Sequence, residues 1–503
     1  MKTMRMAAAA AALALMSGTA FAQSHLRIGL AEDPDILDPT LARTYVGRIV
    51  FASICDKLFD VDAKLNIVPQ LALSHETSED GKTVTIKLRP NVKFHDGEPL
   101  DAEAAKYSLE RHMTMQGSFR RPDLSPVDKV EVVDPLTIRL VLKAPSSPLI
   151  AQLTDRAGMM VSPKAAKEAG DKFGIKPVCA GPYKFVERVQ QDRIVVEKFA
   201  DYWNKAHVFI DKITYLPIID ATVRLANLKS GTLDLLERLN ATDIAAVKSD
   251  NRLKLSAVPD LSYWGITINV ANGDKAKNPL GQHAKVRQAL SLAIDRDAVN
   301  QVVFNGEFVP GNQWVGPDSF YYQKSLPVLK RDVAKAKALI KEAGFDRVKV
   351  HMTVPNSTEF KQSAEILQGM LAEANIDLEL QLVETNTALA EWTAGKFESL
   401  IILWSGRVDI DANIYSFKAC DGALNGGKYC NAEVDKYLKE ARGRVYMPAR
   451  LTAYEAAAKI YLAERPYIYL YHRTNIFGHS AKVEGLRLIP DGLMRVQGLK
   501  MKP

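Results

Sequence analysis

The residues Val348-Lys-Val-His-Met-Thr-Val354 alternate apolar and polar side chains, which is the pattern of a half-buried β-strand. Apolar residues at helical spacing follow from Phe360 to Ala374, and Ile376 to Val383 alternates again. Two strands joined by a helix form a βαβ unit, in which the strands run parallel. We therefore predict an α/β lobe that extends from Gly281 to about Arg465.

An apolar run within this lobe ends abruptly in polar residues, in the stretch Ile401-Ile-Leu-Trp-Ser-Gly-Arg-Val-Asp-Ile-Asp411. The first four residues predict a buried strand, and the turn after them lies where an open α/β sheet places its ligand. Arg407 offers a rigid fork of donors that suits a carboxylate, and Trp404 offers a flat apolar wall. Two interpretations stay open: Arg407 binds a ligand, or it pairs with Asp409 or Asp411 in a solvated loop.

The N-terminus has the pattern of a secretory signal peptide. Lys2 and Arg5 precede an apolar, alanine-rich run, and Ala20-Phe-Ala22 places small residues where a signal peptidase cleaves. No cysteine follows the run, so we do not expect a lipid anchor, and no later run of about 18 apolar residues could span a bilayer. We therefore expect a signal peptide at 1–22 and a soluble, exported mature chain that begins near Gln23.

The composition is that of an ordinary globular protein, with 47% hydrophobic and 25% charged residues, and the length suggests two or three domains. Loss of Lys2 and Arg5 lowers the formal charge from +7 to +5, and the chain has no basic run. This charge excess is too small to indicate a nucleic acid partner.

Four cysteines fit an oxidising compartment, because none lies in a C-x-x-C pair that would indicate zinc or redox chemistry. Cys420 and Cys430 bracket a short glycine-rich loop that can fold back on itself, so we expect a disulfide between them. Cys55 and Cys179 then remain for each other by elimination.

The first half of the chain begins with an alternating strand at Leu26–Leu30. Apolar spacing predicts a helix from Arg48 to Phe59, and Arg43-Thr-Tyr45 is expected in the loop before it. Further along, Val84–Leu88 alternates as a strand, and Asp101 is a good N-cap for a helix.

The stretch Val286–Arg296 predicts another helix, which belongs to the second lobe. Its apolar residues share one face, and we expect Arg287, Asp295 and Arg296 on the solvent side. Two strand-like runs, Tyr263–Val270 and Tyr467–Tyr471, lie at the ends of this lobe.

Six segments of the chain form a distinctive set in a fixed order. They are Glu79–Arg111, Ala180–Phe185, Tyr202–Asn204, Leu225–Asp234, Val286–Arg296 and Pro466–Tyr471. The set resembles the family 5 extracellular solute-binding proteins, which are the dipeptide-, oligopeptide- and nickel-binding components of ABC importers. The resemblance extends from about residue 26 to the C-terminus.

The resemblance implies an α/β fold, the two-lobed periplasmic-binding-protein fold (Venus flytrap), with mixed sheets, an extra subdomain in the first lobe and a hinge. The family's chain passes between the lobes twice and ends in the first lobe. We therefore expect the first lobe at 23–267, with an inserted subdomain at about 60–175. The second lobe is expected at 268–476, and the chain returns to the first lobe at 477–503.

The resemblance also implies where a ligand binds. The family's peptide binders hold the ligand's N-terminal ammonium with an aspartate shortly after a tryptophan. Trp404-Ser-Gly406 keeps that pattern here, but the aspartate position is Arg407. The reversed charge would repel an ammonium and favour a carboxylate, while Asp409 and Asp411 could serve the positive end of a zwitterion.

Other expected contacts come from the first-lobe edge and from the first crossing between the lobes, as the family places them. The complete expected set is Arg43, Thr44, Tyr45, Glu237, Arg238, Tyr263, Trp264, Trp404, Ser405, Gly406, Arg407, Asp409 and Asp411.

The common catalytic motifs are absent from the sequence, which contains neither H-E-x-x-H nor G-x-S-x-G. Gly422–Lys428 has the spacing of a phosphate-binding loop, but Tyr429 replaces the required Ser or Thr. His95 could bind a metal, although its Phe-His-Asp-Gly context favours a turn. We therefore expect no enzymatic activity, no cofactor and no metal.

The resemblance implies a periplasmic receptor of an ABC importer that captures a small polar ligand, peptide-like or carboxylate-bearing, and delivers it to an inner-membrane permease. We expect a monomer that binds no nucleic acid. An exported hydrolase or chaperone on the same scaffold is the alternative function. The alternative ligands are a metal chelate, an opine-like conjugate and a sugar.

Overall fold

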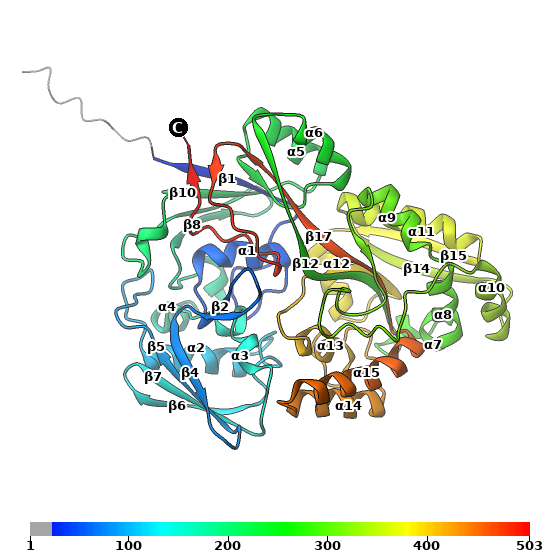
Figure 1. The fold of residues 1–503 in the computed structure, drawn as a ribbon, viewed down its shortest axis with the longest axis horizontal. Coiled ribbons are helices and arrows are strands. Elements are labelled where there is room, and N and C mark those ends of the chain that lie inside the picture. Colours follow the sequence, from blue (N-terminus) through cyan, green and yellow to red (C-terminus); the bar gives the residue numbers. More distant parts are fainter. Residues whose placement is uncertain (1–22, 503) are drawn as a thin grey trace, which may run out of the picture.

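One mixed sheet of 11 strands extends through the computed structural model, which describes residues 23–502 (Figure 1). The expected signal peptide at 1–22 lies outside the described residues. In spatial order the strands are β15 (Ile376–Val383), β14 (Val348–Pro355), β16 (Ser399–Trp404), β12 (Leu253–Ile268), β17 (Tyr467–Ser480), β11 (Leu235–Leu236), β1 (His25–Leu30), β10 (Lys212–Pro217), β9 (Arg193–Lys198) and β8 (Tyr183–Val189), with β13 (Val309–Pro310) beside β17.

Two long strands, β12 and β17, cross the middle of the molecule and pair antiparallel with each other. On one side β17 pairs with β11, β11 pairs in parallel with β1, and β1 pairs in parallel with β10. On the other side β12 pairs with β16, and β14 lies parallel to both β16 and β15. With α11 (Thr358–Ala372) between β14 and β15, this arrangement confirms the predicted βαβ unit.

The first lobe is built around the half of the sheet that contains β1. Its core cluster includes Leu26 and Ile28, and residues Phe477–Leu499 near the C-terminus pack into the same cluster. The remaining strands here are short, namely β2 (Phe59–Val61), β3 (Ile67–Pro69), β18 (Val483–Glu484) and β19 (Lys500–Met501).

Helix α1 (Tyr45–Ile54) corrects the predicted bounds Arg48–Phe59 and the predicted loop at Tyr45. The helix starts earlier because the Thr44 side chain accepts a hydrogen bond from the backbone of Gly47 and caps the first turn. It ends at Ile54 because Cys55 is extended, and residues 59–61 then form β2.

A second core, between Leu58 and Ala180, belongs to a subdomain of the first lobe. Its antiparallel sheet has the order β4 (Ala72–Thr77), β5 (Thr83–Leu88), β7 (Thr137–Leu142) and β6 (Val127–Asp134). Helix α2 (Ala102–Thr114) covers this sheet, and Asp101 accepts a 2.9 Å hydrogen bond from Ala104 N as its predicted N-cap.

The predicted helix Val286–Arg296 is α8 (Ala284–Ala293) in the structure, and it ends before Asp295 and Arg296. Asp295 instead caps the next helix, α9 (Arg296–Phe304), while Arg287 and Arg296 are buried rather than on the solvent side. Arg287 donates to the backbone carbonyls of Leu280, Gly281 and Glu464, and Arg296 donates to Tyr469 O. Each guanidinium therefore satisfies carbonyls where chain segments meet, a role that periodicity does not reveal.

The other α-helices are α3 (Leu149–Gln152), α4 (Pro163–Ala169), α5 (Ala221–Ser230), α6 (Ile244–Lys248), α7 (Pro279–Gln282), α9 (Arg296–Phe304), α10 (Val333–Glu342), α12 (Thr385–Thr393), α13 (Asp411–Lys418), α14 (Ala432–Gly443) and α15 (Met447–Glu464). The part of the chain that the structure describes also contains the 3-10 helices η1 (Arg156–Gly158), η2 (Gly170–Ile175), η3 (Lys205–His207), η4 (Ala241–Asp243) and η5 (Asp274–Ala276). Among residues 23–502, no helix is both long and apolar enough to cross a membrane.

Both expected cysteine pairs are joined in the structure. Cys420 and Cys430 close a loop with a sequence separation of 10, and Cys55 and Cys179 link segments separated by 124 residues. The second disulfide ties the end of α1 to the segment that leads into β8, and both of its cysteines are buried in the core of the first lobe.

The fold buries a histidine that makes stability depend on pH. His112 lies 2.8 Å from Thr40 Oγ1 and 3.0 Å from Met159 O, and burial lowers its pKa to about 4 although the hydrogen bond to Met159 opposes this. Between pH 4 and 6.5 the unfolded chain binds this proton and the folded chain does not. Stability therefore rises with pH across this window and is lost on acidification.

Between pH 7 and pH 4, we expect the free energy of unfolding of His112→Gln to fall by about 3 kcal/mol less than that of the parent protein. A glutamine can donate to Met159 O and accept from Thr40 but does not titrate. Urea unfolding of both proteins across this pH range measures the difference, and two parallel profiles would contradict the assignment.

Candidate ligand-binding site

The loop after β16 is held in one conformation by Asn413, which lies in α13. Its Oδ1 accepts hydrogen bonds from Trp404 Nε1 at 2.9 Å and from Arg407 N at 2.8 Å. Gly406 between them has a positive φ of 73°, and a Cβ there would lie 2.2 Å from Leu261 O. Glycine is therefore required for the turn that carries Arg407 away from the strand.

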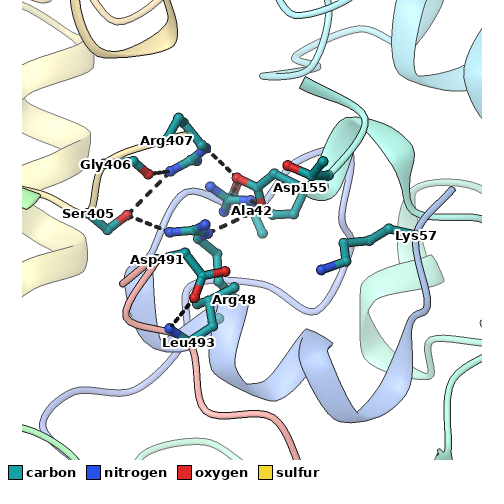
Figure 2. A network of polar contacts seen from close by, with 12 residues as sticks. Ala42, Arg48, Lys57, Asp155, Ser405, Gly406, Arg407, Asp491 and Leu493 are labelled. Carbon is teal, nitrogen blue, oxygen red and sulfur yellow. Dashed lines mark hydrogen bonds and ion pairs between the residues drawn. The ribbon is translucent and has the colours of Figure 1, made fainter. Parts of the chain in front are cut away.

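The side chain of Arg407 extends into the space between the lobes. Its guanidinium lies 4.4 Å from the ring centroid of Trp404, and its Nη1 donates to Gly406 O at 2.7 Å. Its Nε forms an ion pair with Asp155 Oδ2, a residue of the first lobe between α3 and η1 (Figure 2). Arg407 thus joins the two lobes directly.

A second arginine bridges the lobes beside it. Arg48, in α1, donates from Nε to Asp155 Oδ1 at 3.2 Å and from Nη1 to Ser405 Oγ at 3.0 Å (Figure 2). Asp155 therefore lies between Arg48 and Arg407, while Ser405 accepts from Arg48 and, at 3.4 Å, from Arg407.

Burial and charge oppose each other in this cluster. Burial by itself would raise the pKa of Asp155, but the guanidiniums of Arg407, Arg48 and Arg156 outweigh it and hold the pKa well below its usual range. Burial lowers the pKa of Arg407 to about 9, repulsion from Arg48 adds to this shift, and attraction to Asp155 opposes it. Arg407 is therefore still a cation at neutral pH.

A cavity adjoins this cluster. First-lobe residues form one wall and α13 with the following loop forms the other. The lining residues are Arg43, Phe119, Arg120, Pro122, Asp123, Arg156, Trp404, Arg407, Ala412, Ser416, Ala423 and Leu424. Positive guanidiniums and the apolar faces of Trp404 and Phe119 together suit an organic anion.

Comparison with known proteins identifies the group to which this chain belongs. The model of the bacterial extracellular solute-binding proteins, family 5 Middle, matches residues 66–425. The chain belongs to this family. The glutathione-binding protein GsiB of Pectobacterium atrosepticum is similar to it, with 30% identity over 499 residues that cover 97% of this chain and 96% of GsiB.

Solved structures of solute-binding proteins share the fold. The binding protein AgaA of A. tumefaciens R10, in complex with agropinic acid, superimposes with a TM-score of 0.87 at 26% identity, over 95% of this chain and 99% of AgaA. DppA of Helicobacter pylori, in complex with the peptide STSA, also gives 0.87 at 22% identity, over 96% of this chain and 98% of DppA.

The protein is therefore the solute-binding component of an ABC importer, with the α/β periplasmic-binding-protein fold expected from the sequence. This family consists of transport components rather than enzymes, which agrees with the expected lack of catalysis. Among residues 23–502, no group of three or more His, Cys, Asp or Glu side chains could hold a metal ion.

In this solute-binding protein, Asp409 and Asp411 pair with arginines other than Arg407. Asp409 accepts from Arg450 at 2.9 and 2.7 Å, and Asp411 accepts from Arg442 at distances down to 2.7 Å. The interpretation that Arg407 pairs with Asp409 or Asp411 is therefore wrong. The loop that begins at β16 uses both carboxylates to anchor itself on α14 and α15.

Of the three residues predicted at the first-lobe edge, Arg43, Thr44 and Tyr45, only Arg43 lines the cavity. Arg43 lines the cavity and reaches the second lobe, where its Nη1 donates to Leu389 O at 3.1 Å and to Thr393 Oγ1 at 2.8 Å. Thr44 is buried as the cap of α1, and the Tyr45 hydroxyl donates to Gly492 O inside the first lobe.

The remaining predicted residues lie elsewhere. Tyr263 is buried among Tyr467 and Tyr469, and its hydroxyl donates to Asn413 O at 2.9 Å, so it supports α13 from behind. Trp264 and Arg238 line a separate, smaller pocket, with Glu237 buried beside Arg238 and accepting from its Nε at 3.0 Å. The structure thus brings Arg43, Trp404, Ser405, Gly406 and Arg407 together, but not the whole predicted set.

Sequence reasoning missed the first-lobe charges of the cluster, namely Arg48, Arg120, Asp123, Asp155 and Arg156. A signal was present in the stretch Leu149–Val161, where a charged pair interrupts an otherwise mainly apolar run. Charged residues within an apolar run are buried more often than charged residues in a solvated loop, and buried charges are paired.

Proposed function

We propose that this receptor captures a small solute with a carboxylate, or a comparable anionic group, at the buried arginine cluster between its lobes. The observation that supports the proposal is the convergence of Arg43, Arg120, Arg156 and Arg407 on one cavity next to Trp404. Arginine is the side chain best suited to bind a carboxylate in two-point fashion, and it gains most where water is excluded.

Within this proposal, the predicted residues have different roles. Arg407, Arg43 and Trp404 contact the solute, while Ser405 and Gly406 orient Arg407. Asp409 and Asp411 hold the loop, and Thr44, Tyr45 and Tyr263 support its surroundings. Glu237, Arg238 and Trp264 would meet the solute only if it extended into the smaller pocket.

Binding between the lobes also explains how the receptor would signal that it is loaded. With the lobes divided at residues 267 and 476, the chain would pass between them within β12 (Leu253–Ile268) and β17 (Tyr467–Ser480), and these two strands would act as the hinge. A solute that contacts both lobes stabilises the closed form, and only this difference in affinity shifts the population. The closed form, as a periplasmic monomer, would then deliver the solute to an inner-membrane permease.

The direct test is native mass spectrometry of the receptor purified from its host. We expect a small anionic solute to remain bound and to be released unchanged on denaturation. Adding the released compound back should raise the melting temperature in proportion to RT ln(1 + [L]/Kd). A neutral or purely cationic solute, or a solute that is converted at catalytic rates, would contradict the proposal.

A further inference from the structure

The arginine cluster carries more positive than negative charge. Four guanidiniums surround two carboxylates, and all six groups are largely withdrawn from water; they are Arg48, Arg120, Arg156 and Arg407 with Asp123 and Asp155. Arg43, which also lines the cavity, lies 3.7 Å from Asp35 and so adds no net charge. Counted over these four guanidiniums and two carboxylates, the cluster therefore has a net charge of +2.

Some of its donors are also unused. Arg120 Nε and Arg156 Nε are buried and have no hydrogen-bond partner among residues 23–502, although both side chains line the cavity. Arg120 is 5% exposed and Arg156 is 1% exposed, so bulk water does not compensate them. Arg120 still pairs with Asp123, and Arg156 Nε lies 3.9 Å from Asp155 Oδ1, but a buried donor without a hydrogen bond is unfavourable because its desolvation is not repaid.

We infer that the solute is a dianion, which places two negative charges in this cavity, either as two carboxylates or as one phosphate monoester. This inference rests on the proposed function and specifies its ligand class. A zwitterionic peptide would bring one carboxylate together with an ammonium, and that ammonium would face the guanidiniums. A dianion instead brings the cluster to neutrality.

Asp123 and Asp155 act as specificity-determining residues in this scheme because they set how many charges the solute must supply. Asp155 occupies one edge of Arg407 and of Arg48, and Asp123 pairs with Arg120 at 3.2 Å. Without these carboxylates the same four arginines would require four negative charges. With them, the remaining requirement is two.

The test is a calorimetric titration at constant ionic strength with three probes. Glutarate carries two carboxylates, glutaramate has the same length with one carboxylate replaced by an amide, and inorganic phosphate carries its charge on one group. We expect glutarate or phosphate to bind at least tenfold more tightly than glutaramate, and the preferred dianion tells whether the charges are separate or shared. Equal affinity for glutaramate, or no binding of either dianion at millimolar concentration, would overturn the inference.

Variants that change the cluster by one charge sharpen the result. Asp155→Asn and Asp123→Asn raise the net charge and should increase the preference for the dianion, whereas Arg120→Gln should reduce it severalfold. Arg193→Gln removes the same charge as Arg120→Gln but does so on β9, where the Arg193 side chain is 40% exposed. It should leave the preference for the dianion unchanged. An equal shift in the Arg193→Gln control would assign the effect to overall charge and overturn the inference.

The two proposals can fail separately. If Arg407→Ala weakens binding of the co-purifying solute but that solute carries a single negative charge, the proposed function stands and the dianion inference is wrong. If Arg407→Ala leaves that affinity unchanged, the proposed site itself is wrong.

Discussion

Replacing Arg407 by alanine is expected to weaken binding of the co-purifying solute by about 2 to 5 kcal/mol, which is roughly 30-fold to 5,000-fold in Kd. The guanidinium lies at the centre of the proposed site, beside Trp404 and in contact with both lobes through Asp155. Its removal would leave a solute anion in a dehydrated cavity without its nearest counter-charge. Calorimetric titration measures the loss.

The fold itself should tolerate this substitution. Asp155 keeps Arg48 as a partner at 3.2 Å, so the buried carboxylate is not left unpaired. Arg287→Ala is the matched control, because Arg287 is a buried arginine of the second lobe that donates to three backbone carbonyls away from the cavity. We expect Arg287→Ala to lower the melting temperature of the solute-free protein while its solute affinity stays within about threefold, roughly 0.7 kcal/mol.

Arg407→Asp is the more severe variant. It restores the residue type that the family's peptide binders use, but here the new carboxylate would face Asp155 in a buried space. Two carboxylates at that distance repel each other and cannot both stay ionised without cost. We expect native solute binding to be abolished, and affinity within threefold of the parent in both Arg407 variants would remove Arg407 from the site.

Local periodicity predicted individual strands and helices, whereas the two-lobed arrangement came from the resemblance to the family. Alternation at Val348–Val354 and Ile376–Val383 indicated parallel strands, and the apolar run at residue 401 indicated β16, because neighbouring side chains in a strand face opposite sides. Periodicity alone also gave the wrong bounds for α1. Periodicity continues past Ile54, whereas the extended Cys55 that ends the helix is set by packing.

The site was predicted only in part because its partners come from distant segments. Arg407 follows a recognisable strand, but Asp155 lies 252 positions earlier, and nothing in the sequence indicates that the two meet. Sequence reasoning offered Asp409 and Asp411 as the partners of Arg407. Asp409 instead pairs with Arg450 in α15, 41 residues away, and Asp411 pairs with Arg442 in α14. Ion pairs between helices depend on tertiary packing, which sequence spacing does not encode.

Removal of the disulfide between Cys55 and Cys179 is expected to cost about 5 kcal/mol of unfolding free energy, near the upper end for a native disulfide. The bond closes a loop of 124 residues that includes most of the subdomain of the first lobe. Opening it therefore restores a large conformational entropy to the unfolded chain. The double variant Cys55→Ala/Cys179→Ala, unfolded in urea, measures this loss.

The disulfide between Cys420 and Cys430 is the internal control, because it closes a loop of only 10 residues. The same dependence on loop length gives about 3 kcal/mol for this bond, so the two double variants should differ by about 2 kcal/mol. Cys55 and Cys179 are also buried in the first-lobe core, and the small cavities left by alanine can only widen that difference. Equal losses in the two double variants would show that loop length does not determine what these bonds contribute. A larger loss for Cys420→Ala/Cys430→Ala would mean that the loop beside the arginine cluster limits the stability of the whole receptor.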